Sequence, residues 1–192
     1  MFRLVLGPMK SGKSFALISR FAPLAFSDKT FMLFQPAKNT RDAKIESRLG
    51  LQLPAKKITQ LADILLERSL PQVIGIDEIH LFDGSDVGAI SQILKKGHEV
   101  YIVGCNLDYR GKMFDIVKQL LELSPDEVIH QKAVCELCQS TEGIYTQVWY
   151  KGKIMTNGLP PVIVEDGTYV YKPVCRQCFQ QEKEKVRESK LY

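Results

Sequence analysis

The sequence predicts an α/β fold, in which helices flank a largely parallel sheet and a small second subdomain follows. Three observations predict it. Short apolar runs alternate with segments whose apolar residues recur at helical spacing, the first run ends in a glycine-rich loop, and two cysteine pairs occupy the last third. Strands that alternate with helices indicate βαβ units, because parallel strands need a crossover connection.

Four apolar runs rich in β-branched or aromatic residues are expected to form buried strands of this sheet. They are Phe2–Leu6, Thr30–Phe34, Val73–Ile76 and Val100–Val103. Each is bounded by glycine, proline or polar residues, which commonly end strands.

Helical spacing of apolar residues marks three segments between these runs. The segments contain, in chain order, Ile58, Leu61 and Leu65; Val87, Ile90 and Leu94; and Phe114, Val117 and Leu121. Suitable N-cap residues for the second helix are Asp83, Ser85 and Asp86, because their side-chain oxygens can accept backbone N–H groups.

Composition and charge exclude several classes of protein. The chain has 192 residues, of which 45% are apolar and 25% charged, as is typical of a soluble globular protein. The net charge is +4, and the basic residues are dispersed, which argues against a duplex-DNA binder. Apolar runs are shorter than the roughly 20 residues that span a bilayer, and the first strand leads directly into a motif, so we expect no signal peptide. We therefore predict a cytoplasmic protein without nucleic-acid or membrane partners, whose thiols stay reduced.

The segment Gly7–Ser14 matches the phosphate-loop pattern G-x4-G-K-S/T, and it lies between a predicted strand and a predicted helix. Gly12 allows the tight turn that directs successive N–H groups at phosphate oxygens, and the helix start adds its positive dipole end. Lys13 is expected to reach the β- and γ-phosphates of ATP, and the Ser14 hydroxyl to coordinate Mg²⁺. The predicted nucleotide-binding residues of the loop are Gly7, Pro8, Met9, Lys10, Ser11, Gly12, Lys13 and Ser14. Within this set Lys10 is either a further phosphate contact or a solvated surface lysine.

Two acids, Asp77 and Glu78, end the apolar run Val73–Ile76. Ligands bind at the carboxyl ends of strands in open α/β sheets, so both acids are expected beside the phosphate loop. Asp77 is predicted to hold Mg²⁺, and Glu78 to act as the general base for an attacking hydroxyl or water. His80 either contacts nucleotide or makes an ordinary structural hydrogen bond.

Two C-x2-C pairs predict a structural zinc site, because four thiolates suit closed tetrahedral coordination. The predicted metal ligands are Cys135, Cys138, Cys175 and Cys178, whereas Cys105 is expected to be a small buried hydrophobe. The long segment between the pairs is rich in aromatic residues and suits a substrate lid, a nucleic-acid platform or an oligomer contact. Helical spacing ends after about Val134, and two β-like runs follow, Ile144–Tyr150 and Pro161–Val164. We therefore expect a P-loop NTPase-like nucleotide-binding domain over residues 1–133 and a zinc-binding subdomain over 134–192.

In combination these features resemble the thymidine kinases of the human-cytosolic and bacterial type. The resemblance covers nearly the whole chain in matching order. It is carried by the segments Gly7–Ser14, Ala37–Arg41, Ser47–Gly50, Ile76–Phe82, Leu107–Phe114, Ala133–Cys138 and Val174–Cys178. The chain departs from the family at Asn39, where the family has aspartate, at His80 and Asn106, and in the register of the segment that precedes Cys175.

The resemblance implies that Glu78 takes the proton of the 5′-hydroxyl of thymidine and that the segment between the cysteine pairs is a lasso around the thymine ring. It further implies that Arg41 serves nucleotide binding, and His80 is assigned to the nucleotide site for its place near the two acids. The implied substrate-binding residues are Phe82, Leu107, Tyr109, Phe114, Thr146, Val164 and Tyr171, the last preferred to Tyr169 for its distance to Cys175. Thymidine and ATP as substrates, thymidine salvage for DNA synthesis, and a homotetramer are also implied.

Two other interpretations remain open from the residues alone. One is a P-loop ATPase whose zinc-stapled platform stacks nucleic-acid bases on its aromatic side chains. The other is a nucleotide-binding regulatory module without turnover, in which the lasso is a partner surface.

Overall fold

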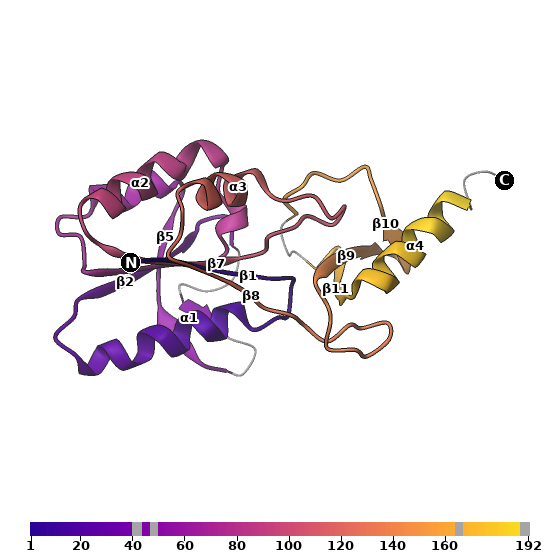
Figure 1. Ribbon diagram of the computed structural model, residues 1–192, viewed down its shortest axis with the longest axis horizontal. Coiled ribbons are helices and arrows are strands. Elements are labelled where there is room, and N and C mark those ends of the chain that lie inside the picture. The colour runs from indigo at the N-terminus through magenta and orange to yellow at the C-terminus, as the bar shows by residue number, and fades with distance from the viewer. Residues whose placement is uncertain (40–43, 47–49, 164–166, 189–192) are drawn as a thin grey trace.

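The structure is a computed structural model that describes residues 1–39, 44–46, 50–163 and 167–188 (Figure 1). Within these residues the chain forms a six-stranded sheet flanked by helices and, beside it, a three-stranded sheet covered by the C-terminal helix. The predicted α/β class with a parallel sheet is therefore confirmed.

The larger sheet has the strand order β5-β2-β6-β7-β1-β8, and every neighbouring pair is parallel. Its strands are β1 (Phe2–Leu6), β2 (Phe31–Pro36), β5 (Lys56–Ile58), β6 (Val73–Ile76), β7 (Glu99–Gly104) and β8 (Glu127–His130). The four central strands lie where the apolar runs predict them, whereas the edge strands β5 and β8 had no predicted counterpart.

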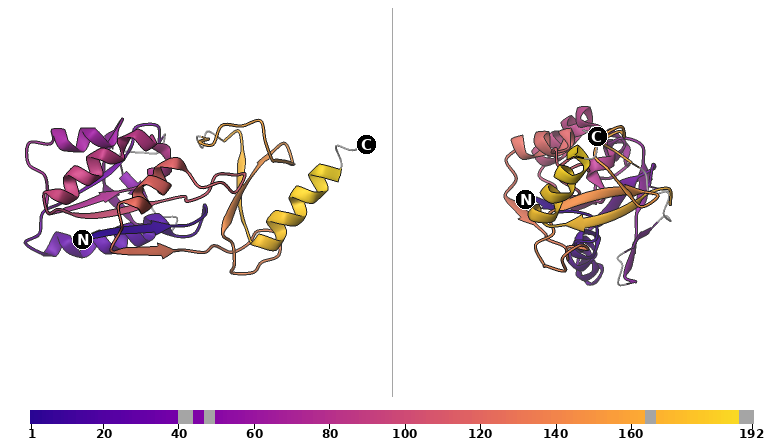
Figure 2. Two further views of the ribbon diagram at one scale, coloured as in Figure 1. Left: turned by 45° about the horizontal axis from the view of Figure 1, so that its top comes forward. Right: turned by 90° about the vertical axis from the view of Figure 1, so that its right-hand side faces the viewer.

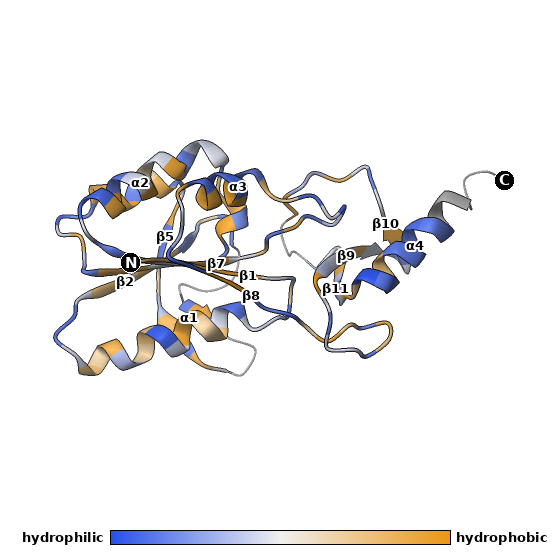
Figure 3. Cartoon of the chain, in the orientation of Figure 1, coloured by the Kyte–Doolittle hydropathy of each residue, from blue (hydrophilic) through white to orange (hydrophobic). Residues whose placement is uncertain are grey.

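Helices cover both faces of this sheet (Figure 1). On one face lies α1 (Lys13–Phe21), followed by the 3₁₀ helix η1 (Ala22–Phe26), and on the other lie α2 (Val87–Lys95) and α3 (Asp115–Glu122). Buried side chains of helices and strands form two apolar clusters, one on each face. Hydropathy colouring shows the apolar residues concentrated along the strands and on the helix sides that face them (Figure 3).

The first helical prediction was partly wrong. Ile58 ends strand β5, and only the short 3₁₀ helix η2 (Leu61–Leu66) follows it. Two further 3₁₀ helices are η3 (Ile79–Leu81) and η4 (Gly84–Asp86); the Asp83 carboxylate caps η4 by accepting the Ser85 N–H.

The second part of the chain is built on antiparallel strands. Its strands β9 (Tyr145–Tyr150), β10 (Lys153–Met155) and β11 (Val170–Val174) have the order β10-β9-β11, and α4 (Arg176–Glu188) follows. The views in Figure 2 show α4 on the side of this sheet that faces away from the larger sheet. A strand was predicted over 161–164, but residues 161–163 lie outside any strand, and Val164 falls outside the described residues. A separate hairpin pairs β3 (Lys44–Glu46) with β4 (Gln52–Pro54).

Among the described residues, no helix combines the length and apolar character needed to cross a membrane. The carboxyl ends of β1, β6 and β7 meet at one edge of the sheet, because Leu6 pairs with Gly104 and Ile76 with Ile102. That edge faces the three-stranded sheet (Figures 1 and 2). The loop after β1 and the acids after β6 are thereby brought together, as the parallel sheet predicts.

Candidate active site

The loop between β1 and α1 has the turns that a phosphate cradle needs. Gly12 has φ +83° and precedes the first residue of α1, and Lys10 also lies in the left-handed region with φ +63°. The Lys13 side chain is buried, and its ammonium donates a 2.6 Å hydrogen bond to the Pro8 carbonyl. A cation is thus held inside the loop, at the start of a helix whose first N–H groups lack intrahelical partners.

Asp77 lies beside this loop and is 4% exposed. Its carboxylate accepts the Ser14 hydroxyl at 3.1 Å and the Glu78 backbone N–H at 2.8 Å. Burial and the neighbouring Glu78 charge raise the pKa of Asp77 to about 7. A hydroxyl and a carboxylate at hydrogen-bond distance fit Mg²⁺, which prefers oxygen ligands, and a cation here would restore the ionised carboxylate.

Glu78 presents a carboxylate oxygen that lacks a hydrogen-bond donor. Its backbone is left-handed, with φ +51°, and Oε2 is buried without a hydrogen-bond partner among the described residues. One titratable neighbour is His80, whose Nδ1 lies 3.5 Å from Oε2. The Cys105 backbone N–H donates to the same Nδ1 at 3.3 Å, which places the proton of a neutral imidazole on Nε2.

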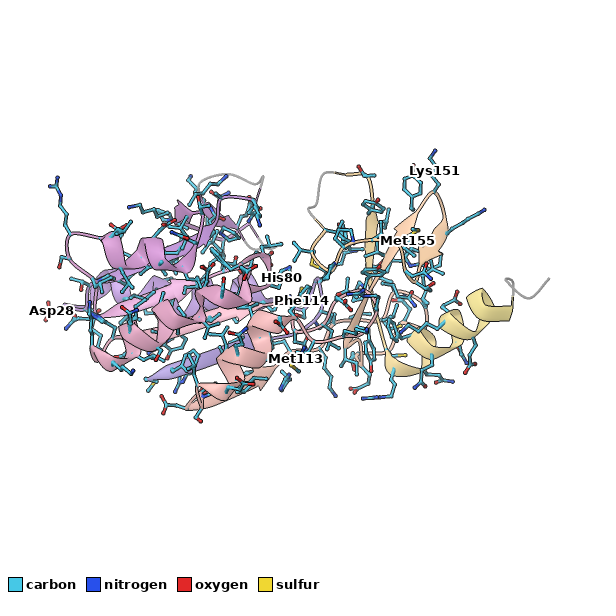
Figure 4. All side chains as sticks on the ribbon, turned by 90° about the horizontal axis from the view of Figure 1, so that it is seen from above. Asp28, His80, Met113, Phe114, Lys151 and Met155 are labelled. Atoms are coloured by element: carbon cyan, nitrogen blue, oxygen red, sulfur yellow. The ribbon has the colours of Figure 1, made fainter. Side chains whose placement is uncertain are left out.

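The surroundings of His80 keep it neutral. Burial lowers its pKa, Lys13 adds to this effect, and Glu78 opposes it. The ring packs against Phe114 with 5.2 Å between ring centroids, and Figure 4 shows both side chains at the edge that faces the second part. A neutral histidine whose Nδ1 is engaged as an acceptor leaves Glu78 free to accept a proton from an incoming hydroxyl.

A pocket of about 680 Å³, including its open mouth, adjoins these groups. Eight of the predicted site residues line it, namely Met9 of the phosphate loop, Glu78, His80, Leu107, Tyr109, Phe114, Thr146 and Tyr171. Sequence reasoning had assigned no ligand contact to the other lining residues, Lys38, Asn39, Leu81, Cys105, Asp108, Val148, Pro161 and Ile163. The pocket is therefore built from both parts of the chain and borders the phosphate loop.

Among the described residues, one predicted substrate contact, Phe82, does not line the pocket. Phe82 is buried in the apolar cluster beneath the sheet edge. Arg41 and Val164 lie outside the described residues. Of the two candidate tyrosines, Tyr171 lines the pocket. Tyr169 instead packs near Tyr150, with ring centroids 5.6 Å apart.

Tyr109 ties the lasso to the pocket. Its hydroxyl donates to the Leu159 carbonyl at 2.8 Å and accepts the Leu159 N–H at 3.1 Å. One side chain thus satisfies both backbone groups of Leu159.

The loop that carries Tyr109 is organised by Asp108, a residue that sequence reasoning missed. Asp108 is buried and accepts the backbone N–H groups of Arg110 and Lys112, each at 2.9 Å. The Arg110 guanidinium also contacts this carboxylate, with Nη2 at 2.6 Å. An aspartate shortly before a glycine is a turn signal that could have identified this residue, because such side chains bond to backbone amides just downstream.

The four paired cysteines converge. Their sulfur atoms all lie within 4.8 Å of one another, and the sulfurs of Cys138 and Cys175 are 3.7 Å apart. Tetrahedral Zn–S bonds of about 2.3 Å imply sulfur separations of about 3.8 Å, so the cluster could hold a structural zinc ion. Cys105 lies apart from this cluster, buried as predicted, with its sulfur 3.7 Å from that of Met9.

Comparisons with known proteins place these features in a family context. The family model described as "TK: Thymidine kinase" matches residues 1–179. Two curated relatives named thymidine kinase come from the J-10-fl and Y-400-fl strains of Chloroflexus aurantiacus. Each is 29% identical over 187 residues, which cover 92% of this chain and 93% of the relative. The family-model match therefore includes the phosphate loop, the pocket and all four clustered cysteines.

Proposed function

The chain belongs to the thymidine kinase family and phosphorylates thymidine, and on this premise we propose that it transfers the γ-phosphoryl group of ATP to the 5′-hydroxyl. The observation that carries the proposal is the shared pocket, in which Glu78 and Met9 of the phosphate loop line the same space. A nucleoside in this space would have its hydroxyl between a carboxylate and a bound triphosphate.

In the proposed reaction Glu78 accepts the proton of the 5′-hydroxyl while the oxygen attacks the γ-phosphorus, and the bond to the ADP oxygen breaks. The unpartnered Glu78 Oε2 supports this role, because a general base needs a free acceptor. Lys13 balances charge on the transferring group. Magnesium bound by Ser14 and Asp77 would neutralise charge on the phosphates.

The pocket walls support a role in holding the base. The nucleotide-binding domain supplies apolar and aromatic surface through Leu107, Tyr109 and Phe114. The lasso supplies polar groups through Thr146 and Tyr171. An apolar pocket with few polar groups is typical of small-molecule sites, in which the polar groups set orientation. We therefore propose these five residues as thymidine contacts.

Wider features of the family are proposed on the resemblance. They comprise a role for Arg41 and Val164 in ligand contact, a structural zinc ion, a homotetramer, and thymidine salvage in the cytoplasm. The division into a nucleotide-binding domain over 1–133 and a lasso subdomain over 134–192 is proposed on the position of the two sheets.

Aromatic side chains of the lasso pack against neighbouring side chains, which favours a kinase over a nucleic-acid platform. Tyr145 stacks on Phe179 with ring centroids 4.1 Å apart, and the Lys172 ammonium lies 4.3 Å from the Trp149 ring. A stacking platform needs ring faces that are open to bases.

The test is ADP release measured with thymidine, with other deoxynucleosides, with single-stranded DNA and with no acceptor. We expect stimulation by thymidine; stimulation by DNA alone, or by nothing, would contradict the proposal. In the same assay Glu78→Gln should lower turnover by roughly 10²–10⁴ while nucleotide binding persists, since that is the usual effect of losing a general base. Near-normal turnover in this variant would remove Glu78 from the mechanism.

A further inference from the structure

The phosphate loop touches the second half of the chain at three places. A methyl group on Gly7 would lie 2.4 Å from the Gln131 carbonyl oxygen, so the segment that leads into the second part lies directly against the loop. The Met9 backbone N–H donates to Thr146 Oγ1 at 2.9 Å. The Lys10 ammonium forms an ion pair with the Glu136 carboxylate.

The last two of these contacts belong to a closed ring. The Glu136 backbone N–H donates to the Pro173 carbonyl of β11 at 2.9 Å. Pro173 in turn is paired with Thr146 in the register of β11 and β9. The ring therefore runs from Lys10 through Glu136, Pro173 and Thr146 back to Met9, so the loop and the three-stranded sheet hold each other at two points.

Hydrogen bonds of the surrounding turn hold the backbone at Glu136. This residue lies between the two cysteines of the first pair, in a turn closed by bonds from Cys135 N–H to the Ser140 carbonyl at 2.7 Å and from Gln139 N–H to the Cys135 carbonyl at 2.9 Å. Its partner Lys10 has the left-handed backbone that non-glycine residues rarely adopt without support from their surroundings.

We propose that Lys10 and Glu136 are positioning residues for nucleotide binding. Their ion pair fixes the phosphate loop against the cysteine turn in the backbone conformation that receives a triphosphate. The inference rests on the proposed ATP binding and assigns to the cysteine turn a task beyond closing the lasso.

The direction in which Glu136→Gln changes nucleotide affinity separates this role from a direct phosphate contact. If Lys10 acted only by touching phosphate, Glu136 would compete for it, and Glu136→Gln would tighten nucleotide binding. Removing a negative charge near an anion site also favours the anion by itself. If the ion pair positions the loop, Glu136→Gln weakens nucleotide binding in spite of that favourable change of charge.

The experiment is calorimetric titration of the zinc-loaded 192-residue chain with AMP-PNP and Mg²⁺. Variants are Lys10→Met, Glu136→Gln, the double variant, and the exchanged pair Lys10→Glu with Glu136→Lys. We expect Kd to rise about two- to five-fold in each single variant, as befits a partly exposed ion pair. The double variant should be no weaker than the worse single variant, and the exchanged pair should recover most of the lost affinity.

The matched control is Glu142→Gln, which removes the Lys132–Glu142 ion pair in the same region, where the structure records no contact of Glu142 with the loop. Its Kd should not change, and all variants should keep their zinc content and Tm. Higher salt should shrink the difference between the unsubstituted chain and Glu136→Gln, because salt screens exposed pairs.

An unchanged or tighter Kd in Glu136→Gln would overturn the inference, as would an equal loss in Glu142→Gln. Failure of the unsubstituted chain to bind AMP-PNP would instead remove the proposed ATP dependence, and this inference with it.

Discussion

Replacing Gly104 with alanine should damage catalysis from a position that is not among those lining the pocket. Gly104 is the last residue of β7, and its carbonyl accepts the Gly7 N–H of the phosphate loop at 3.4 Å. An added methyl group would lie 2.9 Å from the Ile79 backbone nitrogen, 2.7 Å from Ile79 Cγ2 and 3.3 Å from His80 Nδ1. Because that nitrogen belongs to the peptide bond that follows Glu78, the methyl group would displace the proposed base.

The magnitude follows from these contacts. A backbone atom cannot rotate away, so the variant should lose about 1–3 kcal/mol of stability, as overpacked sites do. At roughly 2–4 °C per kcal/mol for a chain of this size, Tm should fall by about 2–12 °C. A displacement of about 1 Å at the base can cost on the order of 10²-fold in kcat.

The assays are differential scanning calorimetry and steady-state turnover with thymidine and ATP. The matched control is Gly88→Ala in α2, where a methyl group meets no atom within 4 Å apart from its own stretch of helix. That variant should gain about 0.5–1 kcal/mol, because alanine favours the helix, and keep its kcat. Normal Tm and kcat in Gly104→Ala would refute the reasoning, as would equal losses in both variants.

Three further predictions concern the groups around the loop. Lys13→Met should weaken AMP-PNP binding by about 10- to 100-fold in calorimetry, as expected for losing a hydrogen bond to a charged group. Lys44→Met on the exposed hairpin should leave the affinity unchanged. Equal affinities of the two variants would contradict the role of Lys13. Asp77, with its pKa raised from 3.8 to about 7, makes a contribution to the stability of the metal-free protein that is complete below about pH 3.8 and lost as pH rises through about 7. The Tm advantage of Asp77→Asn should therefore grow from acid to neutral pH, and a pH-independent advantage would contradict this. Removing zinc with a chelator should lower Tm and expose residues of the second part to amide exchange; a chain that elemental analysis shows to be metal-free, with unchanged Tm, would contradict a structural zinc site.

The central strands could be predicted because they are buried on both faces. Strands β1 and β6 have the predicted bounds, and β2 and β7 differ by one or two residues at their ends. The edge strands escaped prediction since their apolar signal is diluted: β5 has two exposed lysines, and β8 has a single half-buried residue, Val128, among exposed neighbours.

The site divides in a similar way. Residues whose chemistry needs a fixed spacing, such as Lys13 and Ser14 or the cysteine pairs, could be found from local patterns. The contacts Met9–Thr146 and Lys10–Glu136 join residues 137 and 126 positions apart, so only the folded chain reveals them. Asp108 lay between the two cases, because its turn is local but its burial is not.

The reciprocal bonds between Tyr109 and Leu159 have a kinetic consequence. Any motion that swings this stretch of the lasso away from the pocket must break both bonds at once, at a cost of about 1–3 kcal/mol. A ligand that enters or leaves past Leu159 would therefore cross the same barrier in both directions. The Tyr109 phenolic oxygen thereby adds to the free-energy barrier for opening this stretch of the lasso.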